Sequence, residues 1–371
     1  MGIYRVITSS GTFRLKSVKI VFSAIGRILA VFPRRPRDWD RSVLRSYKKI
    51  LVIRPGGIGD AVFLLPILRR LVERGVQVDI LCEERNVSVF RSQNVFKTYR
   101  YDHVREFIDI FDNSYDVIID TEQWHYLSAD IAARIRSKCL IGFASRPSRA
   151  RFFDIPVEYD ADGPELDNFT RLFAVLTAEA TTPGLTGSFK VPAEFQSWAS
   201  QQVRSPFVSL FIGASIPLRR FTREQIISIV RPILAKNIPV VLVGGADVAL
   251  TAKEVVCAVN DERLFDFVGQ ISLGHSVALI EKSRLLVTPD SGLMHLACAV
   301  GTPVVAVFGP GQIKKWAPPE GNNSIVSLNL PCAPCTRFGY TNPTCHGKFS
   351  CMRDISIDQL NDLISKKLAV T

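Results

Sequence analysis

Residues 50–71, ILVIRPGGIGDAVFLLPILRRL, and residues 285–310, LLVTPDSGLMHLACAVGTPVVAVFGP, each join an apolar run to a glycine-bearing turn and then to a helical pattern. This order is typical of a buried strand followed by a helix in an open α/β sheet. Ligands bind at such turns because the N-terminus of the helix points free N–H groups and the positive end of its dipole into the crevice. The sequence therefore predicts two α/β domains with parallel sheets facing one cleft, which receives the carboxylates of Asp60 and Asp290.

The charge of the chain is concentrated at its N-terminus. The 371 residues carry a net charge of +11, and residues 1–49 hold twelve of the 46 Lys and Arg residues against Asp38 and Asp40. A nucleic-acid-binding fold carries its basic charge on the folded domains. We therefore expect no nucleic-acid partner and interpret residues 1–48 as a basic N-terminal extension.

Within this extension, residues 13–32 place apolar side chains at helical spacing on one side and Lys16, Lys19 and Arg27 on the other. Such a basic amphipathic helix binds the headgroup layer of an anionic membrane, or it docks on the protein's own surface. Neither a signal-peptide pattern nor an uncharged run long enough to span a bilayer is evident. We expect a cytoplasmic protein that is peripheral on the inner face of the cytoplasmic membrane.

From residue 49 the chain alternates between strand-like and helical stretches, which predicts parallel sheets with right-handed crossovers. We expect an N-terminal domain over 49–200, a C-terminal domain over 201–355, and a last helix in 356–371 that packs back towards the N-terminal domain. The expected strands are 50–53, 78–82, 117–120, 139–142, 207–212, 240–243, 264–267, 285–287 and 304–308. The expected helices include 61–74, 127–136, 165–178, 222–236 and 357–368, with Thr222 as a possible N-cap.

The first turn contains Gly56, Gly57 and Gly59, which allow positive φ angles and close approach of the backbone, and Asp60 follows them. Asp60 is either the N-cap of the helix that follows or a carboxylate in the cleft that acts as general base on a substrate hydroxyl. An N-cap explains an acid at this point, but it does not explain three glycines preceded by Arg54.

The second turn brings together Asp290, Ser291, Gly292 and His295. Ser291 and the backbone N–H groups from Gly292 onward can hold a diphosphate, and Asp290 can accept hydrogen bonds from sugar hydroxyls. His295, about one turn into the helix, can donate to a phosphate oxygen. The alternative for His295 is a core histidine with satisfied hydrogen bonds.

Two further loops follow strands of the C-terminal half. Ser215 ends a Gly-Ala-Ser turn, and Arg219 and Arg220 after it suit phosphate contact, although a solvated approach to the next helix is the alternative. Asp247, after Gly244-Gly245, either holds a nucleotide hydroxyl or caps the following helix.

Three strings carry a resemblance to a known family. Residues 53–71, the Gly-Ala-Ser turn with Arg219-Arg220-Phe221 after it, and residues 287–310 resemble the signatures of glycosyltransferase family 9, the lipopolysaccharide heptosyltransferase family. The resemblance covers about residues 49–368 and implies a GT-B fold, in which two Rossmann-like domains face a cleft and the C-terminal one holds most of the donor. It also implies inverting, metal-independent transfer of heptose from an ADP-linked donor.

The resemblance assigns roles to residues of this chain. The acid after Gly-Gly-x-Gly, here Asp60, is the implied base, and Asp290, Ser291, Gly292 and His295 are implied to meet the donor sugar and its diphosphate. Where the family has Lys-Arg-Trp, this chain has residues 219–221, Arg-Arg-Phe, which keep the charge but not the compact ammonium group. This change and the basic extension suggest a divergent member with a donor or acceptor other than the usual one.

We expect an inverting glycosyltransferase that needs no cofactor for catalysis. A nucleotide-diphosphate sugar binds across Ser215, Asp247 and residues 290–295, and Asp60 takes the proton of an acceptor hydroxyl that enters from the N-terminal domain. A lipopolysaccharide-core or other lipid-linked glycan acceptor would explain the amphipathic N-terminus. The alternatives are a sugar-nucleotide epimerase or hydrolase of the same fold, and a non-catalytic protein that binds a nucleotide sugar.

Four clustered cysteines, Cys332, Cys335, Cys345 and Cys351, have a spacing compatible with structural zinc. Free thiols or a disulfide are the alternatives, and we favour a site without metal. The triplet 160–162, Asp-Ala-Asp, suits Mg²⁺ on a diphosphate, but the lack of an apolar strand directly before it favours a solvated turn.

Overall fold

The computed structural model describes residues 40–204, 206–319, 321–337, 340–341, 345 and 350–370. The amphipathic segment expected at 13–32, and most of the extension that contains it, lie outside the described residues. Among the helices of the described part, none is both long enough and apolar enough to cross a bilayer.

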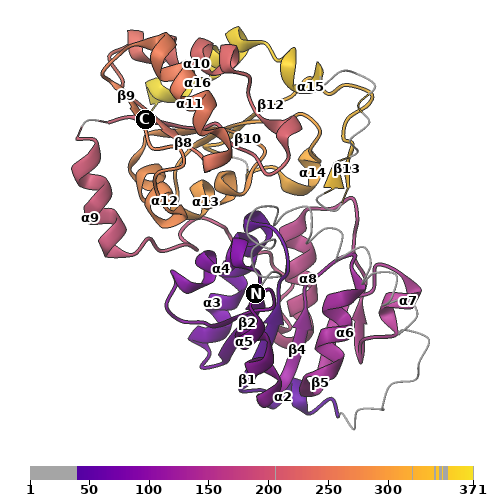
Figure 1. Ribbon diagram of the computed structural model, residues 1–371. Helices are drawn as coiled ribbons and strands as arrows, with labels where there is room; N and C mark the ends of the chain where they lie inside the picture. Colours follow the sequence, from indigo (N-terminus) through magenta and orange to yellow (C-terminus); the bar gives the residue numbers. More distant parts are fainter. Residues whose placement is uncertain are drawn as a thin grey trace, which may run out of the picture.

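The described chain forms two α/β units, drawn indigo to magenta and salmon through orange to yellow in Figure 1. The first unit contains α2 (Val43–Ser46), β1 (Lys49–Ile53), α3 (Ile58–Glu73), β2 (Gln77–Cys82), α4 (Glu84–Arg91), β3 (Lys97–Arg100), α5 (Val104–Asp109), η2 (Ile110–Asp112), β4 (Ser114–Asp120), α6 (Tyr126–Arg134), β5 (Arg136–Phe143), α7 (Pro147–Ala150), β6 (Ile155–Val157) and α8 (Glu165–Thr177). Helix α9 (Ala193–Gln202) follows in the connection.

The second unit begins after this connection. It contains β7 (Val208–Phe211), η3 (Pro217–Arg219), α10 (Arg223–Ala235), β8 (Val240–Val243), η4 (Ala246–Val248), α11 (Ala249–Val259), β9 (Leu264–Asp266), α12 (Leu273–Lys282), β10 (Leu285–Pro289), α13 (Gly292–Val300), β11 (Val304–Val307), α14 (Ile313–Trp316), β12 (Ser324–Val326), β13 (Thr336–Arg337), β14 (Tyr340–Thr341), α15 (Ser350–Arg353) and α16 (Ile357–Val370).

Each unit has one six-stranded sheet in which every neighbouring pair is parallel. The strand orders are β3-β2-β1-β4-β5-β6 and β12-β11-β10-β7-β8-β9. The order of the strands therefore reverses between β1 and β4 in the first sheet and between β10 and β7 in the second. Ligands of open α/β sheets bind at such points, beyond the carboxyl ends of the strands. Both glycine turns of the sequence follow strands at these positions, and the expected α/β class with parallel sheets is confirmed.

The strands that carry the two turns are apolar except for Lys49 at the start of β1 and Thr288 in β10, because helices cover both faces of each sheet. Residues Ile50, Leu51 and Val52 of β1 are all 0% exposed, and β10 is buried throughout. Helix α10 begins as expected, since Thr222 accepts from the Gln225 N–H at 3.2 Å and forms a capping box with that residue.

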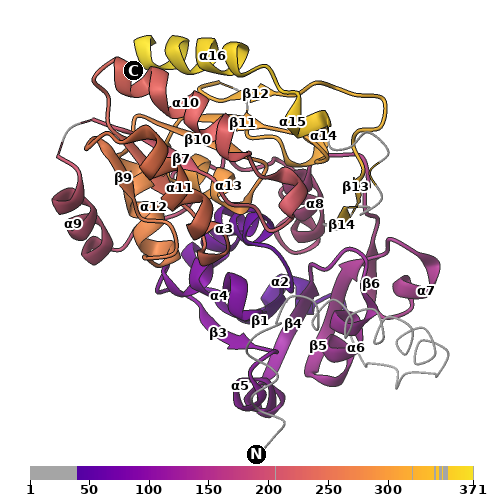
Figure 2. The same cartoon turned by 45° about the horizontal axis from the view of Figure 1, so that its top comes forward.

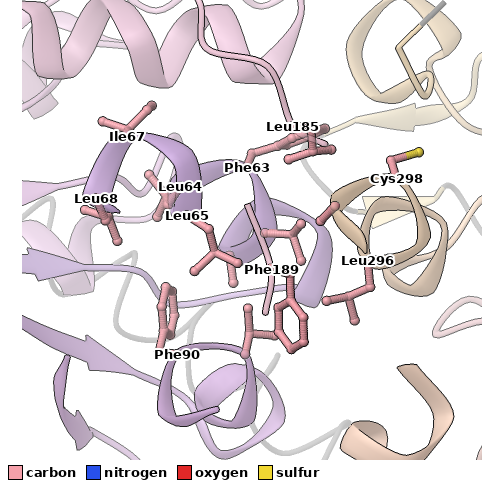
Figure 3. Close-up of a cluster of buried hydrophobic side chains, with 14 of the residues drawn as sticks. Phe63, Leu64, Leu65, Ile67, Leu68, Phe90, Leu185, Phe189, Leu296 and Cys298 are labelled. Carbon is pink, nitrogen blue, oxygen red and sulfur yellow. The ribbon is translucent and has the colours of Figure 1, made fainter. Parts of the chain in front are cut away.

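The two units meet where α3 packs against α13. Helix α13 is buried from Leu293 to Ala299, and α3 is apolar on several sides because it contacts α4 and α8 as well. Figure 3 shows Phe63 of α3 and Leu296 of α13 in one cluster with Leu185 and Phe189 of the connection. The backbone of this connection also pairs with α13, because Gly187 N–H donates to the Ala299 carbonyl at 2.8 Å.

Several expectations about the elements are corrected. Helix α16 packs on α10 and against β10, on the outer side of the C-terminal unit in Figure 2, so the expectation that it packs back towards the N-terminal unit is wrong. Helix α3 begins at Ile58 rather than residue 61, which places Asp60 inside its first turn. Strands β3, β6 and β12 were not expected, because they are short and lie at or near the edges of the sheets.

The contact between the units predicts a large effect of truncating Phe63, which is 3% exposed. We expect Phe63→Ala to lower the free energy of unfolding by about 3–5 kcal/mol, because it leaves a cavity between α3 and α13. Urea denaturation followed by circular dichroism measures this change. The control is Val104→Ala, since Val104 is 71% exposed and its truncation should change stability by less than about 0.5 kcal/mol. Equal effects of the two variants would contradict this account of the contact.

Candidate active site

The turn after β1 is shaped by Arg54, whose side chain folds back under the turn. Gly56 has a φ of +131°, and a Cβ there would lie 2.6 Å from Arg54 Nη2. Gly57 is the N-cap of α3, and a Cβ there would meet nothing within 4 Å. A Cβ at Gly59 would lie 2.6 Å from Cδ2 of His295 in the other unit. Gly56 and Gly59 are therefore sterically required, one by Arg54 and the other by the contact between the units.

Arg54 is a buried cation, 2% exposed. Its Nη1 donates to the Thr121 carbonyl at 2.9 Å, and its Nη2 donates to Asp60 Oδ2 at 3.0 Å. The position of Arg54 directly before the glycines is evident in the sequence, but its role was not predicted. In the structure Arg54 fixes the orientation of the Asp60 carboxylate.

Asp60 is the third residue of α3, and its side chain is 21% exposed. The N-cap interpretation of Asp60 is wrong, because Gly57 occupies that position. Burial raises the pKa of Asp60 to about 6, against the lowering effect of Arg54 and with a further increase from Glu165 and Glu122. The result is a carboxyl group that changes charge close to neutral pH, as a general base requires.

Across the interface, the N-terminus of α13 meets the N-terminus of α3. A Cβ at Gly292, the first residue of α13, would lie 2.7 Å from Ile58 Cβ and 3.3 Å from the Gly59 nitrogen. Two positive dipole ends and their free N–H groups therefore converge beside Asp60. Such a convergence favours an anion such as a diphosphate.

The other members of the second turn lie around this point. The Ser291 hydroxyl is 3.0 Å from that of Thr288, and Ser291 is the N-cap of α13. His295 is 3% exposed, and the centre of its ring lies 4.4 Å from that of Phe63. Burial lowers the pKa of His295 to about 3, so the imidazole is neutral at physiological pH and can donate only one hydrogen bond.

Asp290, at the end of β10, forms a buried ion pair with Arg219 at 2.8 Å. Burial raises the pKa of Asp290, while Arg219 opposes this shift. A Cβ at Gly311 would lie 2.0 Å from Asp290 Oδ2, so this carboxylate needs glycine at that position. Arg219 also donates to the Thr336 hydroxyl at 3.2 Å. The alternative of a solvated approach does not hold for Arg219, which is 8% exposed.

Ser215, Arg220 and Asp247 form a more open rim beside Ala214. Ser215 is exposed, and Arg220 donates to the Ala214 carbonyl at 3.1 Å and pairs with Asp247. Asp247 lies inside η4 and is not the N-cap of either helix here, since Gly245 occupies that position for η4 and Val248 for α11. The two neighbouring arginines thus have different environments, since Arg219 is buried beside Asp290 while Arg220 remains accessible.

The clustered cysteines lie close enough to influence one another. Burial raises the pKa of Cys351 to about 11, and Cys335, Cys345 and Cys332 add to this increase. Among the described residues, no group of His, Cys, Asp or Glu side chains has the geometry of a metal site. In the triplet at 160–162, Asp160 Oδ1 accepts from the N–H groups of Asp162 and Gly163 at 3.0 Å each, which is the turn that sequence reasoning favoured.

Three buried residues near Asp60 were not predicted as parts of the site. Glu122 follows β4, Glu165 begins α8, and Lys315 comes from α14 of the second unit. They are 6%, 0% and 4% exposed. Nothing in the local sequence distinguishes them from surface charges, because their burial results from contacts between segments far apart in the chain.

Two pockets lie on the N-terminal unit. One, with a volume of about 440 Å³, is lined by Arg70, Glu73, Arg74, Glu179 and Thr181 at the C-terminal end of α3. It is remote from Asp60, which lies at the other end of this helix. The second is small and apolar. Its lining includes Pro55 of the turn after β1 and Glu122 and His125 of the segment after β4. Asp60 is not among the residues that line this pocket.

Comparison with known proteins agrees with this architecture. The sequence profile of glycosyltransferase family 9 (heptosyltransferase) matches residues 105–346. The chain is 27% identical to lipopolysaccharide heptosyltransferase 2 of Salmonella typhimurium over 170 residues. This aligned segment covers 44% of this chain and 48% of that protein. The chain thus spans about half the length of this curated relative.

Solved structures show the same fold. The structure of ADP-heptose lipopolysaccharide heptosyltransferase II from Escherichia coli superposes with a TM-score of 0.70 at 19% identity, covering 86% of this chain and 98% of that chain. The iron-containing dodecameric glycosyltransferase TibC from enterotoxigenic E. coli superposes with a TM-score of 0.56 at 13% identity, covering 88% and 77%. With two Rossmann-like units in the GT-B arrangement and a profile match over more than half of its length, this chain belongs to glycosyltransferase family 9.

Proposed function

We propose that this protein is an inverting glycosyltransferase that moves a heptose from ADP-heptose to a lipopolysaccharide-core or other lipid-linked glycan acceptor. The observation that carries the proposal is the position of Asp60. Its carboxylate is oriented by Arg54 and lies where the N-termini of α3 and α13 meet across the interface. The family of the chain and the ADP-heptose enzyme that shares its fold support the choice of donor.

In the proposed mechanism, the donor diphosphate binds at the N-terminus of α13, with Ser291, Gly292 and His295 beside it. Arg220 at the accessible rim pairs with the charge of the diphosphate, while Arg219 keeps Asp290 in place for the sugar hydroxyls. Ser215 and Asp247 line the nucleotide side of the same rim. The leaving diphosphate is stabilised by helix N-termini and arginine, and no metal is needed for this step.

In this mechanism the acceptor hydroxyl approaches Asp60 from the N-terminal unit. Asp60 removes the proton as the oxygen attacks the anomeric carbon from the side opposite the diphosphate. The bond to the acceptor oxygen forms while the bond to the diphosphate oxygen breaks, so the configuration inverts. The proton ends on the Asp60 carboxylate and the negative charge on the leaving diphosphate.

Asp60→Asn tests this role. The amide oxygen can still accept from Arg54, so the fold is retained, but the side chain cannot accept a proton. We expect transfer to fall by about 10²- to 10⁴-fold, measured by mass spectrometry of the glycosylated acceptor in the presence of EDTA. The matched control is Asp362→Asn on the exposed side of α16. Retained transfer by Asp60→Asn, or donor consumption by the unmodified protein without acceptor, would argue against the proposal.

The pH dependence of transfer follows from the environment of Asp60, since its pKa is raised to about 6. A base acts only when ionised, and ionisation is lost as the pH falls through the pKa. We therefore expect kcat/KM to decrease tenfold per pH unit at pH values below about 6 and to level off above it. A profile that stays flat down to pH 4.5 would contradict this assignment.

We also propose that residues 13–32 bind the protein to the anionic face of the membrane that carries its acceptor. The full chain should sediment with phosphatidylglycerol vesicles and not with phosphatidylcholine vesicles, and binding should weaken as salt is added. Replacing Lys16, Lys19 and Arg27 with Gln should weaken binding by about 1 kcal/mol for each charge. Equal binding to both kinds of vesicle would exclude the electrostatic part of the proposal.

A further inference from the structure

Lys315 of α14 reaches out of the C-terminal unit into the N-terminal one. Its Nζ lies 2.9 Å from Oε2 of Glu165, donates to the Ala161 carbonyl at 3.4 Å, and lies 4.4 Å from the centre of the Tyr159 ring. All three partners belong to the first unit, and Lys315 itself is 4% exposed. A buried lysine with such partners is a specific contact between the units rather than a surface charge.

Its partner Glu165 is held in one orientation. The side chain is 0% exposed, Oε2 accepts from the Tyr159 hydroxyl at 2.8 Å, and Oε1 accepts from Gln123. Burial and the Glu165 carboxylate raise the pKa of Tyr159, so the phenol stays neutral and keeps donating. Glu165 is therefore a fixed negative charge beneath the site.

Glu165 belongs to an acid cluster that we define as Asp60, Glu122 and Glu165. The positive charge of Arg54 attracts all three carboxylates, and Arg54 donates a hydrogen bond to Asp60. Glu122 accepts from the N–H groups of Trp124 and His125, which keeps it in the loop after β4. The nearby Arg149 is paired with Asp120. Lys315 thus adds to the cluster a positive charge that originates in the other unit.

We propose that Lys315 is a positioning residue that supplies, across the domain interface, a positive charge needed by the acid cluster and so couples contact between the two domains to the action of Asp60 as a base. This inference rests on the proposed function of Asp60. Lys315 touches neither donor nor acceptor in this account and acts through Glu165 and the cluster.

The charges around Asp60 determine the sign of each effect. Burial, Glu165 and Glu122 raise the pKa of Asp60, whereas Arg54 and Lys315 lower it. His295, which packs from α13, is neutral, and Glu83 acts on Arg54 from the start of α4. If the domains separate, Lys315 leaves with the C-terminal unit while Glu165 remains, and the loss of this cation by itself raises the pKa of Asp60. Contact with the second unit therefore supplies a charge that offsets part of the increase caused by burial.

The test is the acidic limb of the profile of kcat/KM against pH, measured on the full chain. Lys315→Met removes the cation, so we expect the limb to move to higher pH by about half a unit or more. Glu165→Gln removes the anion and keeps hydrogen-bonding groups for Tyr159 and Gln123, so we expect the limb to move to lower pH. The matched control is Lys314→Met, an exposed neighbour on the same helix, which should leave the limb unchanged.

The opposite directions separate electrostatic positioning from a structural role. A contact that only holds the domains together would lower activity in both variants at every pH, without opposite shifts of the limb. The double variant Glu165→Gln with Lys315→Met should bring the limb back towards that of the unmodified protein. Lys315→Arg, which keeps the charge, should also leave the limb near its original pH.

Limbs that move in the same direction, or that do not move, would overturn the inference. Should Lys315→Met fail to fold, the double variant compared with Glu165→Gln still decides the matter, because these two differ only at residue 315 and the limb of the double variant should lie at higher pH. Asp60→Asn keeps the two proposals apart. If Asp60→Asn retains transfer, the proposed function fails. If Asp60→Asn loses transfer but the acidic limbs of the Lys315 and Glu165 variants do not move, only the proposed role of Lys315 is rejected.

Discussion

The packing of α3 on α13 is the contact on which the rest of the site depends. These two helices follow the strands at which the order of each sheet reverses. Their N-terminal turns meet at Gly59, which packs against the His295 side chain, and at Gly292, which packs against the Ile58 side chain. A methyl group at either position would lie within 2.7 Å of an atom of the other unit. The glycines therefore allow a distance between the helices that brings two positive dipole ends to Asp60.

Burial has opposite consequences on the two sides of this contact. On the N-terminal side it raises the pKa of Asp60 to about 6, so that this carboxyl group can both take and release a proton near neutral pH. On the C-terminal side it lowers the pKa of His295 to about 3, which keeps the imidazole neutral. Arg54 and Lys315 limit the first effect, one from each unit. The charge state of Asp60, the proposed base, is thus a property of the assembled interface rather than of either unit alone.

The fold was predictable where local pattern and position agree. The runs that became β1 and β10 are apolar throughout because both faces of a parallel sheet are covered, and glycine must follow where helices approach closely. Prediction was wrong for α16, because an amphipathic helix shows that one face is buried but not which unit covers it. The predicted position of Asp60 in its helix was also wrong, because α3 begins at Ile58. Its N-cap is Gly57, which has no side chain and therefore lacks the Ser, Thr, Asp or Asn signal of an N-cap.

The sequence by itself determined the two strand–turn–helix segments, the residues that line them and the resemblance to a family, since these depend on neighbours in the chain. Only the tertiary structure decided which charges are buried together. Lys314 and Lys315 are adjacent lysines, yet Lys314 is exposed, whereas Lys315 is buried and forms an ion pair with Glu165. Likewise Arg219 and Arg220 differ in burial and partner. The physical reason is that the cost of burying a charge is offset by partners distant in sequence, which no local pattern can identify.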